Sequence, residues 1–295
     1  MRSRQDGEAP ELKLAPLRPA GGRPPLFCLP GAGGAVSIFG ALASLMDDGQ
    51  PVYAIDMGGV FAGDRRLAVE PLAEACCAAI RQAQPRGPYH LCGYSFGALV
   101  AYEAAARLKR DGDAVGVVAL IDTGNPAFGR RQSSVEARRT QRTYLSNRIR
   151  KYFGYLARGE VRSFAASLGA LLASRVGVRA RRAIRRALLA LGRPMPLILQ
   201  NNDPMLVEAW LAYDPPPSAA PLLLFYESYR QAEYGGDPSL GWGLCASGKV
   251  EVELASGGHV DMMGVRHARR LAARLSEIMR DRPGPIPPPD ASPQR

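Results

Sequence analysis

Short, wholly apolar runs alternate with helix-like stretches along most of the chain, and this alternation limits the folds that the sequence can adopt. Runs apolar on both faces, joined by helices, predict a mainly parallel α/β sheet flanked by helices on both sides. The apolar runs lie at residues 26–29, 52–55, 89–92, 115–121, 222–226 and 250–254. The helical patterns lie at residues 35–46, 71–84, 98–110 and 265–279.

The alternation is interrupted once, between the fourth and fifth of these apolar runs. This interval has helical patterning and is strongly basic. Residues 130–193 hold 17 Lys and Arg against two Glu, a local charge of +15 in a chain whose net charge is +11. Within it, Ile184, Leu188 and Leu191 fall on one helical face, with arginines around the remainder. The basicity of the protein therefore belongs to a helical insert.

These patterns predict one domain with one insertion. We expect a flexible leader at residues 1–23, an α/β domain at 24–281 and a Pro-rich disordered tail at 282–295. The helical lid insertion spans about residues 127–215.

Targeting and cysteine usage predict a soluble, cytoplasmic protein. The first residues carry charges and prolines without the apolar core of a secretory signal. The longest apolar stretch, residues 164–173, is far shorter than the roughly 20 residues that cross a bilayer, so we expect no membrane insertion. The five cysteines include no Cys-x-x-Cys pair, which favours reduced thiols and gives no metal site.

The sequence Gly-Tyr-Ser-Phe-Gly at residues 93–97 lies between a predicted strand and a predicted helix. This is the context of a nucleophile elbow, in which a serine stands on a strained turn at the carboxyl end of a strand. Gly93 and Gly97 are the glycines that such a tight turn requires. The alternative is an ordinary Gly-rich turn, but the flanking elements favour Ser95 as a nucleophile.

A serine nucleophile needs a base and an orienting carboxylate. His259 lies in a loop after the last predicted strand, whereas His90 lies within a strand and His267 on the final helix. Two carboxylates compete as the acid. Asp122 directly follows the strand at 115–121, and Asp237 lies in a loop beyond a later strand. We favour Asp122, because a rigid strand end positions it; either choice gives the chain order serine, acid, histidine.

The oxyanion of an acyl transfer is stabilised by two backbone N–H groups. One belongs to Phe96, directly after the nucleophile. The other is predicted at Ala32, in the Gly-rich loop at residues 30–34 that follows the first apolar run. That loop lacks the Gly-Lys-Ser/Thr ending of a phosphate-binding P-loop, which disfavours a phosphate site.

Several stretches of this chain resemble the type I thioesterase domains that end nonribosomal peptide and polyketide assembly lines, a family with the α/β-hydrolase fold. The similarity covers about residues 14–279. In that family the acid follows the strand after the elbow helix, which falls on Asp122, and a helical lid follows it. Many members have Asp before the histidine, where this chain has Gly258; we expect a changed loop but the same triad. The matching stretches are residues 24–34, 87–97, 120–123, 240–242 and 257–259.

The resemblance implies a function. The substrate would be an acyl or peptidyl chain delivered on the phosphopantetheine arm of a carrier protein, with no cofactor bound by this domain. Ser95 would take the chain as an ester and release it by hydrolysis or cyclisation. Three alternatives remain: a stand-alone editing (type II) thioesterase, a lipase or esterase acting on oxygen esters, and a non-catalytic acyl-binding protein.

If the protein is a thioesterase of this kind, the basic insert has a candidate function. Carrier proteins are usually acidic, so a positive lid would steer an acyl or peptidyl carrier protein toward the site. The competing interpretation is an ordinary solvated helical face. Nucleic acid is disfavoured as a partner, because the insert offers few aromatic side chains for base stacking.

Overall fold

The computed structural model describes most of the predicted domain. The leader before residue 12, the tail and most of the insert lie outside the described residues. Within the described ranges, no helix is both long and apolar enough to cross a membrane. These ranges are residues 12–62, 67–131, 204–255, 257–259 and 261–280, with single positions at 154, 157, 161, 165 and 187.

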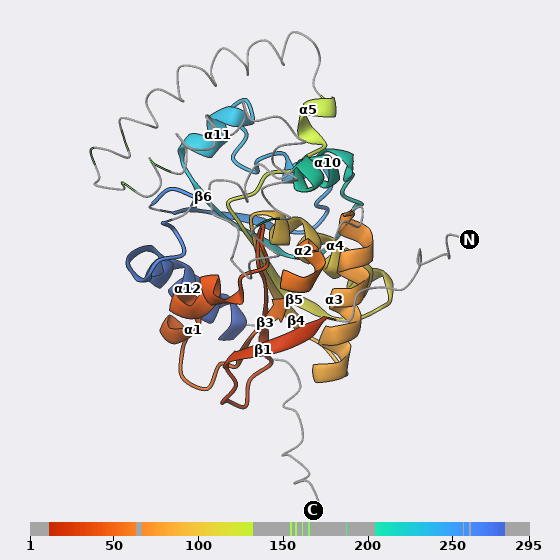
Figure 1. The fold of residues 1–295 in the computed structure, drawn as a ribbon, viewed down its shortest axis with the longest axis vertical. Helices are drawn as coiled ribbons and strands as arrows, with labels where there is room; N and C mark the ends of the chain where they lie inside the picture. The colour runs from red at the N-terminus through yellow and green to blue at the C-terminus, as the bar shows by residue number, and fades with distance from the viewer. Residues whose placement is uncertain are drawn as a thin grey trace, which may run out of the picture.

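The described residues form a seven-stranded sheet in the order β1-β3-β2-β4-β5-β6-β7 (Figure 1). Neighbouring strands from β3 to β7 in this order run parallel, and β1 is antiparallel to β3. The predicted mainly parallel α/β sheet is therefore confirmed. The strands are β1 (Lys13–Arg18), β2 (Leu26–Leu29), β3 (Val52–Asp56), β4 (Tyr89–Tyr94), β5 (Val115–Ile121), β6 (Leu222–Glu227) and β7 (Val250–Ala255).

The strand β1 lies within residues 1–23, which the sequence pattern predicts as a flexible leader. That part of the prediction is wrong. β1 pairs with the edge of β3, and Arg18 donates to the backbone oxygen of Met46 and to Asp48 at 2.6 and 2.8 Å. Pro16 interrupts the strand pattern in the sequence, but an edge strand tolerates proline because one side of it makes no ladder hydrogen bonds.

Helices cover both faces of the sheet, as Figure 1 shows. Along β2, Phe27 and Leu29 pack in the core on the side of α3 and α4, while Leu26 and Cys28 pack on the side of α1 and α12. This alternation explains why the central strands read as continuous apolar runs: both faces of each strand are buried. The covering helices are α1 (Gly40–Leu45), α3 (Val69–Ala83), α4 (Phe96–Arg110) and α12 (Val265–Arg280).

Shorter elements depart from the prediction. The helix expected at residues 35–46 is a 3-10 turn, η1 (Val36–Phe39), followed by α1. Pro71 was expected to open a helix, but α3 begins two residues earlier at Val69 and holds Pro71 in its first turn. Three short helical elements outside the insert were not predicted, because they span too few turns to display a helical period. They are α2 (Gly58–Ala62), α11 (Tyr229–Glu233) and η2 (Trp242–Leu244). The helices α5 (Phe128–Arg131) and α10 (Pro204–Ala212) lie within the interval that the sequence predicts as a helical insert.

The insert leaves the sheet after β5 and returns before β6. Arg130 of α5 donates to the backbone oxygens of Leu211 and Tyr213, at the end of α10. The Tyr213 hydroxyl donates in turn to Glu103 of α4 at 3.0 Å. The two ends of the insert are thus tied to each other and to the core. Its basic interior, including the predicted apolar face at Ile184, lies outside the described residues.

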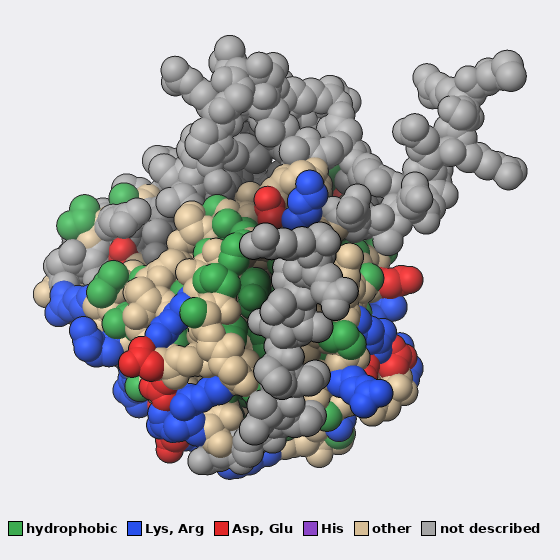
Figure 2. Space-filling model, turned by 90° about the horizontal axis from the view of Figure 1, so that it is seen from below, with side chains coloured by type: hydrophobic (Ala, Val, Ile, Leu, Met, Phe, Trp, Pro, Cys, Tyr) green, Lys and Arg blue, Asp and Glu red, His purple; other side chains and the backbone are tan. Residues whose placement is uncertain are grey.

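Outside the insert, the described surface carries charges of both signs. Figure 2 shows Lys and Arg side chains interspersed with Asp and Glu side chains over the face it displays. Many of them are paired, as in the ion pair between Arg18 and Asp48 or that between Arg270 and Glu253, both at 2.8 Å. This mixture agrees with the sequence, in which the strong positive charge is confined to the insert.

Candidate active site

Ser95 lies on the turn that joins β4 to α4, with φ +54° and ψ −122°. A non-glycine residue at positive φ is strained and persists only where its surroundings fix it. Here the Ser95 N–H donates to the backbone oxygen of Ile121 at 2.9 Å, and its own carbonyl accepts from the N–H of Ala98 at 3.0 Å. The strained turn puts the serine at the carboxyl end of the sheet and at the start of a helix.

Close packing around the turn requires glycine on both sides of Ser95. A Cβ atom at Gly93 would lie 2.4 Å from the Cα of Ala98. A Cβ atom at Gly97 would lie 2.2 Å from the carbonyl oxygen of Leu29. Both obstacles are backbone atoms, which cannot rotate away, so the elbow is compatible with glycine at these positions and with no larger residue.

His259 and Asp122 are in direct contact. The Nδ1 of His259 lies 2.5 Å from the Oδ2 of Asp122, whose side chain is 3% exposed. Asp122 directly follows β5 at φ +49°, and its N–H donates to the backbone oxygen of Phe225. The other histidines are placed elsewhere: His90 is buried in β4 against Gly116, and His267 lies on α12.

The competing carboxylate, Asp237, has a different role in the structure. It accepts hydrogen bonds from the N–H and hydroxyl of Ser239 and from the N–H of Gly241, each at 2.8 Å. These bonds hold the turn that leads into η2. Of the two candidate acids, the one that meets the histidine is Asp122.

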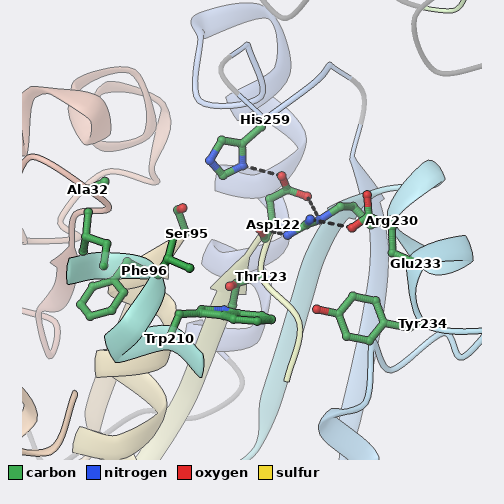
Figure 3. Close-up of a pocket in the computed structure, with 12 residues that line it drawn as sticks. Ala32, Ser95, Phe96, Asp122, Thr123, Trp210, Arg230, Glu233, Tyr234 and His259 are labelled. Carbon is green, nitrogen blue, oxygen red and sulfur yellow. Dashed lines mark hydrogen bonds and ion pairs between the residues drawn. The ribbon is translucent and has the colours of Figure 1, made fainter. Parts of the chain in front are cut away.

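Ser95, Asp122 and His259 line one pocket of about 390 Å³ (Figure 3). In Figure 3 the second ring nitrogen of His259 is turned to the side of the pocket on which Ser95 lies. The helix α10 supplies an apolar wall, and α11 supplies a polar one. The other lining residues are Ala32, Phe96, Thr123, Leu206, Val207, Trp210, Arg230, Glu233 and Tyr234.

The loop after β2 packs directly against the elbow. A Cβ atom at Gly31 would lie 3.0 Å from the Cβ of Ser95 and 3.1 Å from the carbonyl oxygen of Tyr94. Ala32 therefore reaches the same pocket as Phe96, the first residue of α4. In Figure 3 the two residues lie on the side of Ser95 away from Asp122.

Tyr94 contacts the histidine in two ways that no sequence pattern predicted. Its hydroxyl donates to the backbone oxygen of His259 at 2.5 Å, and the two rings stack with centroids 4.9 Å apart. Burial raises the pKa of Tyr94 well above its ordinary value, so the phenol keeps its proton and stays a donor. The only signal in the sequence was an aromatic residue directly before the nucleophile.

Arg230 holds the acid from the other side and was also missed. Its Nε lies 3.3 Å from the Oδ1 of Asp122, and its Nη2 donates to the Asp122 backbone oxygen at 2.9 Å. Its Nη1 pairs with Glu233 at 2.8 Å. Burial alone would lower the pKa of Arg230, but the charges of Asp122 and Glu233 outweigh it and raise the pKa above its ordinary value. No sequence signal marked Arg230, because the short helix α11 was not predicted.

The chemistry that these groups support is acyl transfer. A hydroxyl on a strained turn and a histidine bonded to a buried carboxylate are components that activate a serine for this reaction. Among the described residues, no three His, Cys, Asp or Glu side chains gather in a way that would hold a metal ion.

Several curated proteins similar to this chain are large synthetases, and the chain matches only a small part of each. It is 40% identical over 111 residues to malpinin synthetase of Mortierella alpina, covering 37% of this chain and 1% of that protein. It is 34% identical over 112 residues to the dimodular nonribosomal peptide synthase of Bacillus subtilis, covering 37% of this chain and 5% of that protein.

Solved structures share the fold. A four-domain nonribosomal peptide synthetase bound to AMP and glycine superposes with a TM-score of 0.63 at 21% identity, covering 93% of this chain and 20% of that chain. The NocB thioesterase domain of the nocardicin cluster superposes with a TM-score of 0.55 at 20% identity, covering 90% and 98%. The family model of the thioesterase domain matches residues 24–279, a span that contains the whole sheet except β1 and all of the pocket. The resemblance seen in the sequence is thereby confirmed, and the chain belongs to the thioesterase domain family.

Proposed function

We propose that this domain releases an acyl or peptidyl chain from the phosphopantetheine arm of a carrier protein, through an ester on Ser95. The observation that carries the proposal is the 2.5 Å contact between His259 and Asp122 at the rim of the pocket that also holds Ser95. The names of the related synthetases support a carrier-bound source for the chain.

In the first half-reaction, the Oγ of Ser95 attacks the thioester carbonyl carbon while its proton passes to the Nε2 of His259. Asp122 keeps the proton of the Nδ1 in place and stabilises the imidazolium that forms. The carbonyl oxygen becomes an oxyanion that accepts hydrogen bonds from the N–H groups of Ala32 and Phe96. The C–S bond then breaks, and the imidazolium returns the proton to the departing thiolate.

In the second half-reaction, His259 takes a proton from an attacking nucleophile, and the ester bond to Ser95 breaks as the serine recovers its proton. Water as the nucleophile gives a free acid. A hydroxyl or amine within the chain gives a ring. The same two N–H groups stabilise the second oxyanion, and removing one such donor typically costs about 10²–10³ in rate.

The pocket walls support a small-molecule acyl chain as the group transferred. Leu206, Val207 and Trp210 of α10 offer apolar surface to the pocket.

All five cysteines are free thiols, which supports a reducing compartment such as the cytoplasm as the place where the protein acts. A stand-alone editing role uses the same chemistry on short, blocking acyl groups.

The charge of the insert supports docking of an acidic carrier protein on the insert. The test replaces Arg179, Arg181 and Arg182 by Glu. Loading from an acidic carrier protein should then slow, while hydrolysis of a small N-acetylcysteamine thioester stays unchanged. Equal loss with both substrates would count against docking on the insert.

The proposed activity is tested by release of an acyl group from an acylated phosphopantetheinyl carrier protein. Release should require Ser95 and exceed the rate with the matching p-nitrophenyl oxygen ester, since the esterase alternative predicts the reverse preference. A Ser95→Ala variant that releases the chain at the wild-type rate would refute the proposal. Binding of the acylated carrier without turnover by the wild type would favour the non-catalytic alternative.

A further inference from the structure

The carboxylate of Asp122 is shared between two partners, His259 and Arg230. One oxygen faces the Nδ1 of His259 at 2.5 Å, and the other faces the Nε of Arg230 at 3.3 Å. Figure 3 shows the chain of contacts running from His259 through Asp122 and Arg230 to Glu233. A serine, a histidine and a carboxylate suffice for the reaction, so Arg230 calls for a separate explanation.

Arg230 contacts Asp122 at two places. It bonds the backbone oxygen of Asp122 as well as the side chain, and Asp122 has the strained φ of +49°. The side chain of Arg230 is only 25% exposed, so solvent screens its charge weakly at this distance. The permanent positive charge of Arg230 therefore lies next to the Asp122 carboxylate, which also contacts His259.

We propose that Arg230 is a positioning residue that fixes Asp122 on the Nδ1 of His259 and, as a charged second partner of the same carboxylate, shares its negative charge. The inference rests on the proposed serine mechanism. A cation next to Asp122 competes with the imidazolium for the negative charge and repels it as a like charge. Both effects favour the neutral imidazole, which is the form that accepts the proton of Ser95.

The other titratable groups around the histidine do not reverse the effect of Arg230 on the imidazole. Glu233, on α11, partly offsets the charge of Arg230 by pairing with its Nη1. Tyr94, on β4, and Tyr234, which follows α11, are phenols whose pKa values burial raises, that of Tyr234 to about 12, so both are neutral. Asp261, two residues beyond His259, acts equally in every variant considered below.

The experiment measures the second-order rate at which a small fluorophosphonate labels Ser95, as a function of pH. The acid limb of this profile reports the pKa of the free enzyme's base and needs no thioester. Arg230→Met should move the limb to higher pH by about 0.5–1 unit, because a nearby like charge is lost. Arg230→Lys keeps the charge and should hold the limb near the wild-type position, while its plateau rate falls because a lysine lacks the fork that bonds Asp122 twice.

A second variant should shift the acid limb in the opposite direction, and its result does not depend on the first. Glu233→Gln removes the carboxylate that offsets Arg230, so the limb should move to lower pH. An arginine that only supports the fold would lower the plateau in all three variants without moving the limb. An acid limb unmoved or lowered in Arg230→Met, or raised in Glu233→Gln, would overturn the inference. Equal labelling of the wild type and a Ser95→Ala variant would instead overturn the proposed serine mechanism itself.

Discussion

The phenol of Tyr94 stacks on the imidazole of His259 and donates to the backbone oxygen of the same residue. Tyr94 directly precedes Ser95 in the chain, so one β4 strand end holds the proposed nucleophile and also the loop that carries its base. The histidine is fixed from two directions, by Tyr94 at its backbone and ring face and by Asp122 at its Nδ1.

Replacing Tyr94 separates these two contacts. Tyr94→Phe keeps the stacking and removes one hydrogen bond, worth about 0.5–1.5 kcal/mol, so kcat/KM should fall about two- to tenfold. Tyr94→Ala loses both contacts, so its kcat/KM should fall further. Steady-state hydrolysis of an N-acetylcysteamine thioester measures both variants. Wild-type kcat/KM in Tyr94→Phe would mean that the hydrogen bond does not hold the histidine loop in place.

The two candidate acids are distinguished by matched amide substitutions. Asp122→Asn should lower kcat by a factor on the order of 10³–10⁴, because an amide favours the wrong imidazole tautomer. Asp237→Asn is the control. It weakens the bonds to Ser239 and Gly241, so it should lower Tm by about 2–5 °C and leave kcat within about twofold. A loss of catalysis in Asp237→Asn as large as that in Asp122→Asn would contradict the assignment.

The elbow geometry predicts opposite outcomes for two Gly→Ala substitutions. Gly97→Ala would put a Cβ atom 2.2 Å from a backbone oxygen, so it should abolish labelling of Ser95 or prevent folding. Gly40, at the start of α1, has φ −57° and open space around the position of a Cβ. Gly40→Ala should stabilise the fold by about 0.4–1 kcal/mol. Urea unfolding and fluorophosphonate labelling measure both; normal labelling in Gly97→Ala would contradict the close packing of the elbow.

Buried thiols predict that the fold weakens in alkaline solution. Burial raises the pKa of Cys77 to about 12 and that of Cys76 still higher. A folded-state pKa above the unfolded one gives stability that is complete below the unfolded value, near pH 8.5–9, and is lost as the pH rises beyond it. Each thiol should lower the free energy of unfolding by up to about 1.4 kcal/mol per pH unit in that range.

Urea unfolding at pH 8, 9 and 10 measures this loss, and Cys76→Ala is the variant to compare. It should be less stable than the wild type at pH 8, because it leaves a cavity, but should lose less stability between pH 9 and 10. If the free energy of unfolding fell equally steeply with pH in the two proteins, burial would not be raising the pKa of Cys76.

The central sheet and the proposed triad were accessible from the sequence for one physical reason. In a parallel sheet both faces are buried, so strands such as β5 are continuous apolar runs, and a polar residue directly after such a run stands at the sheet's carboxyl edge. Asp122 was favoured over Asp237 by that rule, and the contact with His259 agrees with it.

What the sequence did not reveal are contacts between distant segments. β1 is a half-buried edge strand whose apolar pattern is interrupted by Pro16, so its pairing depends on β3. Arg230 lies 108 residues from Asp122 on a five-residue helix with no detectable period. Tyr94 filled a variable position of the elbow motif, and its hydrogen bond depends on where the His259 loop folds back. Local patterns carry no information about such partners.

The most direct test of the serine mechanism is intact-protein mass spectrometry after brief mixing with an acylated phosphopantetheinyl carrier protein. His259→Ala and Asp122→Asn should slow acylation as well as deacylation, so the wild type, quenched with acid within its first turnovers, is the protein in which to trap the acyl group. The account predicts a mass increase equal to the acyl group, located at Ser95 by peptide mapping and absent from Ser95→Ala. Turnover by the wild type with the acyl group on another residue, or with Ser95→Ala equally active, would contradict it.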